Sequence, residues 1–168
     1  MARLAALSRF DSLGPLPGLK IDPAKVDALG RGTKYDLCSS TSTKRRVEGS
    51  HGIGDVLRGG LCHSFTGNGR CVSLFKTLYT NACPLDCRYC TNSRNSRGSA
   101  RTFSYSPEEL ARITVGLYRS NRIEGLFLSS GMGRDENETM EEMIETVRLL
   151  RGIHRFRGYV HLKILPGS

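Results

Sequence analysis

Three cysteines within one short segment are the part of this sequence best suited to chemistry. They are Cys83, Cys87 and Cys90, in the spacing Cys-x3-Cys-x2-Cys. Thiolate sulfur is the ligand that holds iron–sulfur clusters, and such clusters are normally held by four cysteines. A site with only three protein ligands leaves one metal position open to an outside ligand, which is typical of catalytic metal sites. The motif therefore predicts a cluster with one iron open to a further ligand.

A zinc site is the main alternative for the same cysteines. Zinc sites are usually built from two Cys-x2-Cys or Cys-x2-His pairs, and Cys87 and Cys90 form the only such pair here. Cys62 with His63, or Cys71, would have to complete the site. An auxiliary metal site is a further alternative, and the residues available to it are Cys38, His51, Cys62, His63 and Cys71. On the zinc hypothesis, the protein is a non-enzymatic nucleic-acid-binding module.

Hydrophobic periodicity and capping residues predict the elements that position these cysteines. A run of β-forming residues over 72–79 predicts a strand that leads directly into the motif. Ser106, Pro107 and Glu109 match an N-terminal capping box, so a helix is expected from 106 to about 121. The remaining expected elements are a strand over 125–129, a helix over 139–152 and a strand over 159–165.

This order of strand, helix, strand, helix and strand predicts a parallel βαβαβ sheet of the α/β class. Ligands bind at the carboxyl ends of such strands, and the cysteine motif follows the first of them. Three parallel strands are few for an α/β domain, and the last strand would be left as an open edge. We therefore expect residues 71–168 to be the N-terminal part of a longer, truncated domain.

Residues 1–70 are expected to form an N-terminal extension and an irregular segment. The extension includes a Gly-Pro-Leu-Pro-Gly run, which suits neither a helix nor a sheet. Asp22 is a good N-cap, Pro23 suits the first helical position, and Gly30 can end a short helix. Gly, Ser and Thr are frequent over 31–70, so little regular structure is expected there.

The charge balance favours polyanionic partners. The chain has 25 Lys and Arg against 16 Asp and Glu, a formal net charge of +9. Such a surplus suits nucleic acid or nucleotides, and a merely soluble surface is the alternative. Two groups of basic residues are available to phosphates, and they are Arg88, Arg94, Arg97 and Arg101 around the motif, and Lys44, Arg45 and Arg46 upstream.

The composition is that of a globular protein, with 38% hydrophobic and 24% charged residues. No apolar run approaches the roughly 20 residues that a membrane helix needs. The short apolar stretch at the N-terminus is interrupted before it can form the core of a signal peptide. We expect a cytoplasmic protein with no membrane partner.

The motif resembles the signature of the radical S-adenosylmethionine (SAM) superfamily. That signature is Cys-x3-Cys-x2-Cys after the first strand of a barrel, with an aromatic residue before the last cysteine, here Tyr89. Over roughly 34–168 the sequence is more closely similar to the DNA modification or repair radical SAM proteins. The segments that carry this similarity are Lys34-Tyr35-Asp36, Lys44-Arg45-Arg46, Cys62-His63-Ser64-Phe65, Glu124-Gly125-Leu126-Phe127-Leu128-Ser129-Ser130-Gly131, His154-Arg155-Phe156 and Gly158-Tyr159-Val160-His161-Leu162-Lys163. Members of that group are longer and are expected to carry a helix-hairpin-helix DNA-binding motif toward the C-terminus, which this sequence does not contain.

The resemblance implies the first part of a radical SAM (partial TIM-like) barrel with a [4Fe–4S] cluster. Cys83, Cys87 and Cys90 would each bind one iron, and the fourth iron would bind the amino and carboxylate groups of SAM. Tyr89 would lie near the adenine. An electron donor similar to flavodoxin or ferredoxin would reduce the cluster. SAM would then be cleaved to methionine and a 5′-deoxyadenosyl radical that acts on DNA or a nucleotide.

The resemblance also implies how SAM is held. Ser129-Ser130-Gly131 stands where the family has a Gly-Gly-Glu-like stretch that binds the SAM amino group. Hydroxyl groups and backbone carbonyls would replace the missing carboxylate. Lys163 is a candidate partner of the SAM carboxylate, and a solvated lysine at a strand end is the alternative. On this interpretation the chain contains the cluster end of an enzyme active site and need not be active alone.

Overall fold

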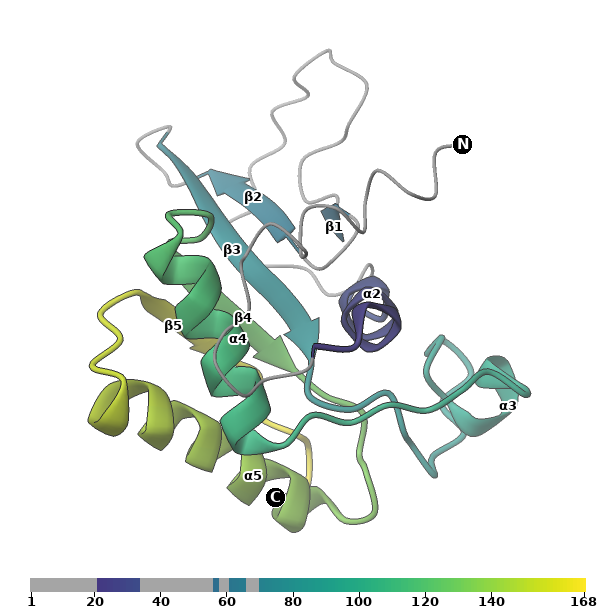
Figure 1. The fold of residues 1–168 in the computed structure, drawn as a ribbon. Coiled ribbons are helices and arrows are strands. Elements are labelled where there is room, and N and C mark those ends of the chain that lie inside the picture. Colours follow the sequence, from purple (N-terminus) through teal and green to yellow (C-terminus); the bar gives the residue numbers. More distant parts are fainter. Residues whose placement is uncertain (1–20, 34–55, 58–60, 66–69) are drawn as a thin grey trace.

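The computed structural model describes residues 21–33, 56–57, 61–65 and 70–168 of the chain. Within them, one five-stranded mixed sheet has the order β1-β2-β3-β4-β5 (Figure 1). The strands are β1 (Val56–Leu57), β2 (Leu61–Phe65), β3 (Cys71–Leu78), β4 (Gly125–Ser129) and β5 (Tyr159–Leu162). β1, β2 and β3 are antiparallel neighbours, whereas β3, β4 and β5 run parallel. The α/β class and a small open parallel sheet are therefore confirmed.

Two helices connect the parallel strands and lie together on one side of the sheet (Figure 1). The helical elements are α2 (Pro23–Arg31), α3 (Arg94–Arg97), α4 (Pro107–Arg119), α5 (Glu136–Arg148) and a π-helical turn, η2 (Leu149–Ile153). α4 begins where Ser106 Oγ accepts a hydrogen bond from the Glu109 backbone N–H at 3.2 Å. Its apolar face buries Leu110, Ile113 and Leu117, as their helical spacing predicts. None of the described helices is both long and apolar enough to cross a membrane.

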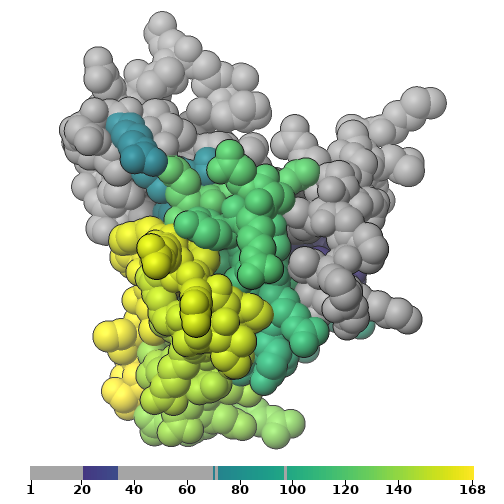
Figure 2. All heavy atoms as spheres, turned by 60° about the vertical axis from the view of Figure 1, so that its left-hand side comes forward, coloured from purple at the N-terminus to yellow at the C-terminus, as the bar shows by residue number. Residues whose placement is uncertain are grey.

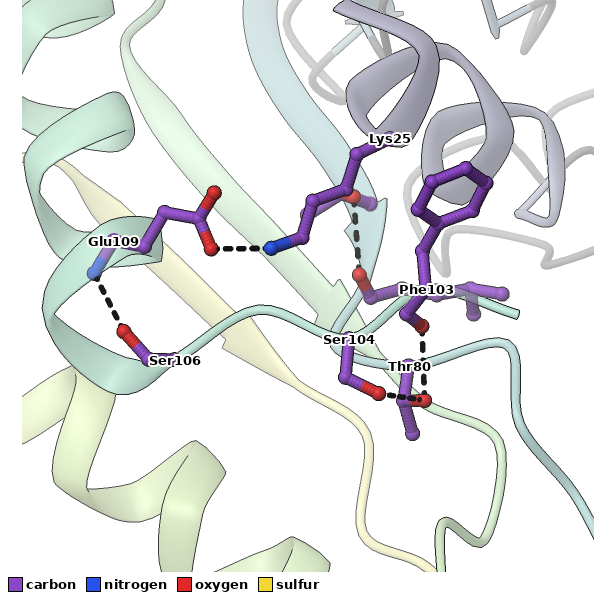
Figure 3. A network of polar contacts seen from close by, with 8 residues as sticks. Lys25, Thr80, Phe103, Ser104, Ser106 and Glu109 are labelled. Atoms are coloured by element: carbon purple, nitrogen blue, oxygen red, sulfur yellow. Dashed lines mark hydrogen bonds and ion pairs between the residues drawn. The ribbon is translucent and has the colours of Figure 1, made fainter. Parts of the chain in front are cut away.

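α2 joins the same hydrophobic core beside the carboxyl end of β3 (Figure 1). Val26 and Leu29 are buried in the core that α4 and the sheet share. Lys25 reaches α4, where its ammonium group forms an ion pair with Glu109 (Figure 3). The side chain of Asp22 caps the first turn, as the sequence predicts. An N-terminal helix is thereby fixed next to the strand that leads into the cysteine motif.

Two buried tyrosines lie in the core around the start of the motif. Burial raises the pKa of Tyr79 above its ordinary value, and the Glu142 carboxylate raises it further. Burial also raises the pKa of Tyr105. Both phenols therefore stay protonated and neutral near pH 7, and neither is a candidate base.

Two helix boundaries differ from the sequence predictions. α5 begins at Glu136 rather than near Thr139, because Asp135 Oδ1 accepts hydrogen bonds from two backbone N–H groups of the first turn. η2 continues the helical path beyond α5, close to the predicted end. α2 does not end at Gly30, which is buried inside the helix, but continues to Arg31.

The strand predictions also need two corrections. β5 ends at Leu162, three residues before the predicted end at 165. Within 31–70, where little regular structure was expected, β1 and β2 extend the sheet. The Leu61 position pairs with Phe75 and the Phe65 position with Cys71, so β2 spans most of the length of β3. Long-range pairing with β3 stabilises a strand that local composition does not favour.

Candidate functional site

Backbone pairing continues beyond the ends of β3 and β4 and fixes the start of the cysteine motif. The Gly131 N–H donates to the Thr80 carbonyl at 2.7 Å. The Gly133 N–H donates to the Ala82 carbonyl at 3.0 Å. The segment before Cys83 therefore runs along the turn that follows β4.

A third segment, which leads into α4, holds the same stretch from its other side. Thr80 Oγ1 lies 3.0 Å from the Phe103 carbonyl, to which it donates, and 2.6 Å from Ser104 Oγ (Figure 3). Asn81 Oδ1 accepts from the Phe103 N–H at 2.7 Å. Backbone hydrogen bonds join the same segments, from the Asn81 N–H to the Phe103 carbonyl at 3.2 Å and from the Tyr105 N–H to the Tyr79 carbonyl at 3.0 Å. Backbone and side chains together therefore fix the point at which the motif begins.

The motif itself folds into tight turns. The Cys90 N–H donates to the Cys87 carbonyl at 3.1 Å. The Arg94 N–H donates back to the Leu85 carbonyl at 2.9 Å, which closes the loop around the cysteines. The loop and α3 extend away from the sheet (Figure 1). Local hydrogen bonds, rather than packing in the main core, determine the shape of this segment.

One cavity of about 390 Å³ lies beside the carboxyl ends of β3, β4 and β5. Every residue that the sequence predicted for the cluster and for SAM lines it, namely the three cysteines, Tyr89, Ser129-Ser130-Gly131 and Lys163. Gly32, which follows α2, forms a further wall, and Asn92 Nδ2 donates to its carbonyl at 3.4 Å. The structure thus brings together predicted site residues from three segments that are distant in sequence.

Three cysteine thiols in this cavity are the donor set that the sequence predicts for a metal centre. Cys83, Cys87 and Cys90 are half-buried and free. Among the described residues, no three His, Cys, Asp or Glu side chains gather closely enough to hold one metal ion. A cubane cluster requires less convergence, because each of its cysteines binds a different iron. The donor set suits such a cluster with one iron left for another ligand.

The β4 and β5 side of the cavity offers neutral and cationic groups. Ser130 Oγ accepts a hydrogen bond from the Thr80 N–H at 3.3 Å. The Lys163 N–H donates to the Leu128 carbonyl at 2.9 Å, which places this lysine level with the end of β4. None of the described residues that line the cavity is Asp or Glu. An amino group bound here would have to be met by hydroxyl groups and backbone carbonyls.

One exposed aromatic residue lines the cavity, and exposed arginines lie in and after the motif loop. Tyr89 is 91% exposed, so its ring is accessible to a ligand or a partner. Arg88, Arg94 and Arg101 are exposed as well. The Arg101 guanidinium lies 4.8 Å from the centre of the Phe103 ring, which orients it. The structure describes the backbone of Arg97 in α3 but not its side chain.

A polar row on the sheet face away from α4 and α5 was missed in the sequence. Lys76 is only 2% exposed, and its Nζ lies 5.1 Å from the centre of the Phe127 ring. His161 stacks on the same ring with centroids 4.7 Å apart, and its Nδ1 lies 3.2 Å from Tyr159 Oη. Alternation along the three predicted strands would have placed these residues on one face. Ser129 and Lys163 follow this row, each two residues further along the chain than Phe127 and His161.

Some residues considered for metal or phosphate binding lie outside the described residues, and they are Cys38, Lys44, Arg45, Arg46 and His51. Cys62 and His63 occur in β2, opposite Leu74 and Ser73, and Cys71 is the first residue of β3. The structure does not describe the side chains of these three. An auxiliary metal site therefore stays a prediction.

No protein-family model, no curated protein and no solved structure matches this chain. The resemblance to radical SAM proteins is therefore carried by the sequence motifs alone. The functional argument depends on those motifs and on the geometry of the cavity.

Proposed function

We propose that this chain is the N-terminal part of a radical SAM enzyme that acts on nucleic acid. The observation that carries the proposal is the convergence of the predicted residues on one cavity. The cysteines follow β3, the serines lie at the end of β4 and directly after it, and the lysine follows β5. These residues therefore come from three separate segments of the sequence. Their meeting at the carboxyl ends of parallel strands is the arrangement in which α/β proteins bind ligands.

In this proposal Cys83, Cys87 and Cys90 hold a [4Fe–4S] cluster, and the opposite wall of the cavity binds SAM. When bound, these cofactors supply the one-electron reductive cleavage of SAM to methionine and a 5′-deoxyadenosyl radical. The protein's task is to bind, to orient and to exclude water. Apolar side chains between the polar groups, among them Leu78 and Met132, serve the exclusion of water.

The residues of β4 and β5 would orient SAM. Lys163 offers the positive charge that a carboxylate needs, and it lies beside Ser129 at the end of the sheet. Ser130 and the backbone at Gly131 offer oxygen atoms to an ammonium group. The turn at 129–131 is rigid, because Gly131 is hydrogen-bonded to Thr80. A pre-formed wall of this kind reduces the entropy lost on binding.

A nucleic-acid substrate is supported by exposed residues in and after the motif loop. Arg88, Arg94 and Arg101 are exposed around the motif, and arginine matches the geometry of phosphate groups. Tyr89 adds an exposed aromatic ring, on which a base can stack. We therefore propose nucleic acid as the substrate and DNA modification or repair as the reaction.

Anaerobic reconstitution with iron and sulfide tests the proposed function. We expect about four irons per chain and a brown colour that bleaches in air, followed by cleavage of SAM on addition of dithionite. Triple replacement of Cys83, Cys87 and Cys90 by Ala should abolish iron binding. Triple replacement of Cys38, Cys62 and Cys71 by Ala is the matched control and should keep the iron. One tightly bound zinc without iron would instead support the zinc-binding module.

A further inference from the structure

The turn that follows α5 combines two uncommon backbone features. η2 is a π-helical turn, and such turns often occur at functional sites. Arg155 adopts a φ of +50°, a left-handed conformation that Gly or Asn takes more readily. The Phe156 N–H donates to the Leu150 carbonyl at 2.8 Å, which holds the chain directly after Arg155. A left-handed residue after the C-cap is a common way for a helix to end, and here it fixes where the chain turns after η2.

Aromatic packing fixes this turn against the end of α4. Phe156 is buried, and the ring of Tyr118 meets it edge-on with centroids 4.7 Å apart. The Arg151 guanidinium lies 5.5 Å from the centre of the same ring, and its Nη1 donates to the Phe156 carbonyl at 2.6 Å. In Figure 2 the yellow residues that follow α5 lie against green residues of the α4 region. Arg119 directly follows Tyr118 and Arg155 directly precedes Phe156, so this ring contact brings the two chain segments that carry these arginines together.

Positive charges from both segments meet around His154. Burial lowers the pKa of His154, and the nearby charges of Arg119 and Arg112 lower it further. Neither of these arginines, nor Arg155, is in an ion pair with a carboxylate of the described residues. We call Arg112, Arg119, His154 and Arg155 the basic corner.

The helix dipole accounts for only part of the basic corner. The C-termini of α4 and α5 carry partial negative charge, which favours a cation at each end. This favours Arg119 in the last turn of α4, whereas Arg112 lies near the middle of that helix, where the dipole has little effect. The corner therefore has positive charge to spare, and an anion bound there would relieve the repulsion.

We propose that the basic corner binds the phosphate groups of a nucleic-acid strand. Arg119, His154 and Arg155 lie toward the amino ends of the parallel strands, because α4 and α5 run back from the carboxyl ends, and Arg112 lies two turns before Arg119 on α4. The corner is thus a second contact that does not depend on the proposed reaction. Arginine favours phosphate, and Tyr118 places an exposed aromatic ring beside the charges, a combination typical of single-strand binding. Basic residues at both ends of the sheet suit a long polyanion better than a compact acidic protein.

Fluorescence anisotropy with a labelled single-stranded DNA of about 20 nucleotides tests this proposal on the full chain. We expect Arg112→Gln/Arg119→Gln to weaken binding roughly tenfold, and to lower the slope of log affinity against log salt by about 1.4, the share of two phosphate contacts. The comparison variant is Arg31→Gln/Arg134→Gln, which removes the same formal charge from two exposed arginines that are not among those we propose to contact nucleic acid; Arg31 pairs with Asp27. Its affinity should fall clearly less than that of the corner variant. Thermal melts should confirm that both variants stay folded.

Unchanged affinity in the corner variant, or an equal loss in the comparison variant, would overturn the proposal. The proposal would also be overturned if the corner variant lost binding to anionic lipid vesicles but bound DNA as tightly as the unaltered chain. Repeating the measurement in the variant that lacks Cys83, Cys87 and Cys90 separates the two proposals, because the corner should bind without a cluster. A second readout is the NMR titration of His154, whose pKa should rise when the strand binds beside it.

Discussion

Gly131 is the residue whose replacement tests the cavity most directly. Its backbone lies against the segment that leads into the motif, with its N–H donating to the Thr80 carbonyl. A Cβ at this position would lie 2.6 Å from the Ala82 carbonyl oxygen and 3.1 Å from that of Thr80. Both obstacles are backbone atoms, which cannot rotate away as the end of a side chain can. Gly131→Ala should therefore push the start of the motif away from the β4 turn.

The expected cost of Gly131→Ala is that of over-packing, about 1–3 kcal/mol in the free energy of unfolding. For a chain of this size, that corresponds to a fall in Tm of roughly 2–12 °C. Thermal unfolding followed by circular dichroism measures this change. Cys83 is the next residue after Ala82, whose carbonyl oxygen the new Cβ would meet. The iron content after anaerobic reconstitution should therefore fall by more than the loss of folded protein explains.

Gly152→Ala is the matched control for this substitution. A Cβ there meets nothing within 4 Å, and no left-handed φ requires glycine. Alanine should stabilise the chain slightly, by about 0.4–1 kcal/mol, because it restricts the unfolded state. Equal stability and equal iron content in the two variants would refute the reasoning, since the close approach of Gly131 to the motif would then have no consequence.

Two further predictions concern α2 and the basic corner. Lys25→Met should lower the free energy of unfolding, measured in urea titrations, by about 1–3 kcal/mol, because Glu109 would be left half-buried without its cation. The double variant Lys25→Met/Glu109→Gln should recover part of this loss. If the double variant is no more stable than the single one, the ion pair does not hold α2 in place. The pKa of His154 is lowered in the folded chain, so the unfolded chain takes up the proton more readily. The stability that this residue contributes is therefore fully present above about pH 6.5 and is lost as the pH falls below that value. His154→Gln should therefore flatten the fall in stability below that pH in urea titrations, and an unchanged profile would contradict the pKa shift.

The sequence was informative where a local pattern and the tertiary structure agree. The predicted strands over 72–79 and 125–129 differ by at most one residue at each end from β3 and β4, since buried β-forming runs need little context. The start of α5 was misplaced because Thr139 and Glu142 imitate a capping box, whereas the observed first turn contains no apolar residue to mark it. β2 could not be predicted from composition, because its strand character comes from pairing with β3.

The meeting of the site residues follows from the register of the parallel strands. Leu78 pairs with Ser129, and Leu128 pairs with Leu162, so Lys163 is level with Ser129 at the end of the sheet. A shift of one residue in either pairing would turn these side chains to the opposite face. The hydrophobic pattern of β5 opposes that shift, because it would move Val160 and Leu162 out of the core shared with α4. The same packing that stabilises the sheet therefore places a lysine and a serine beside the cysteine loop.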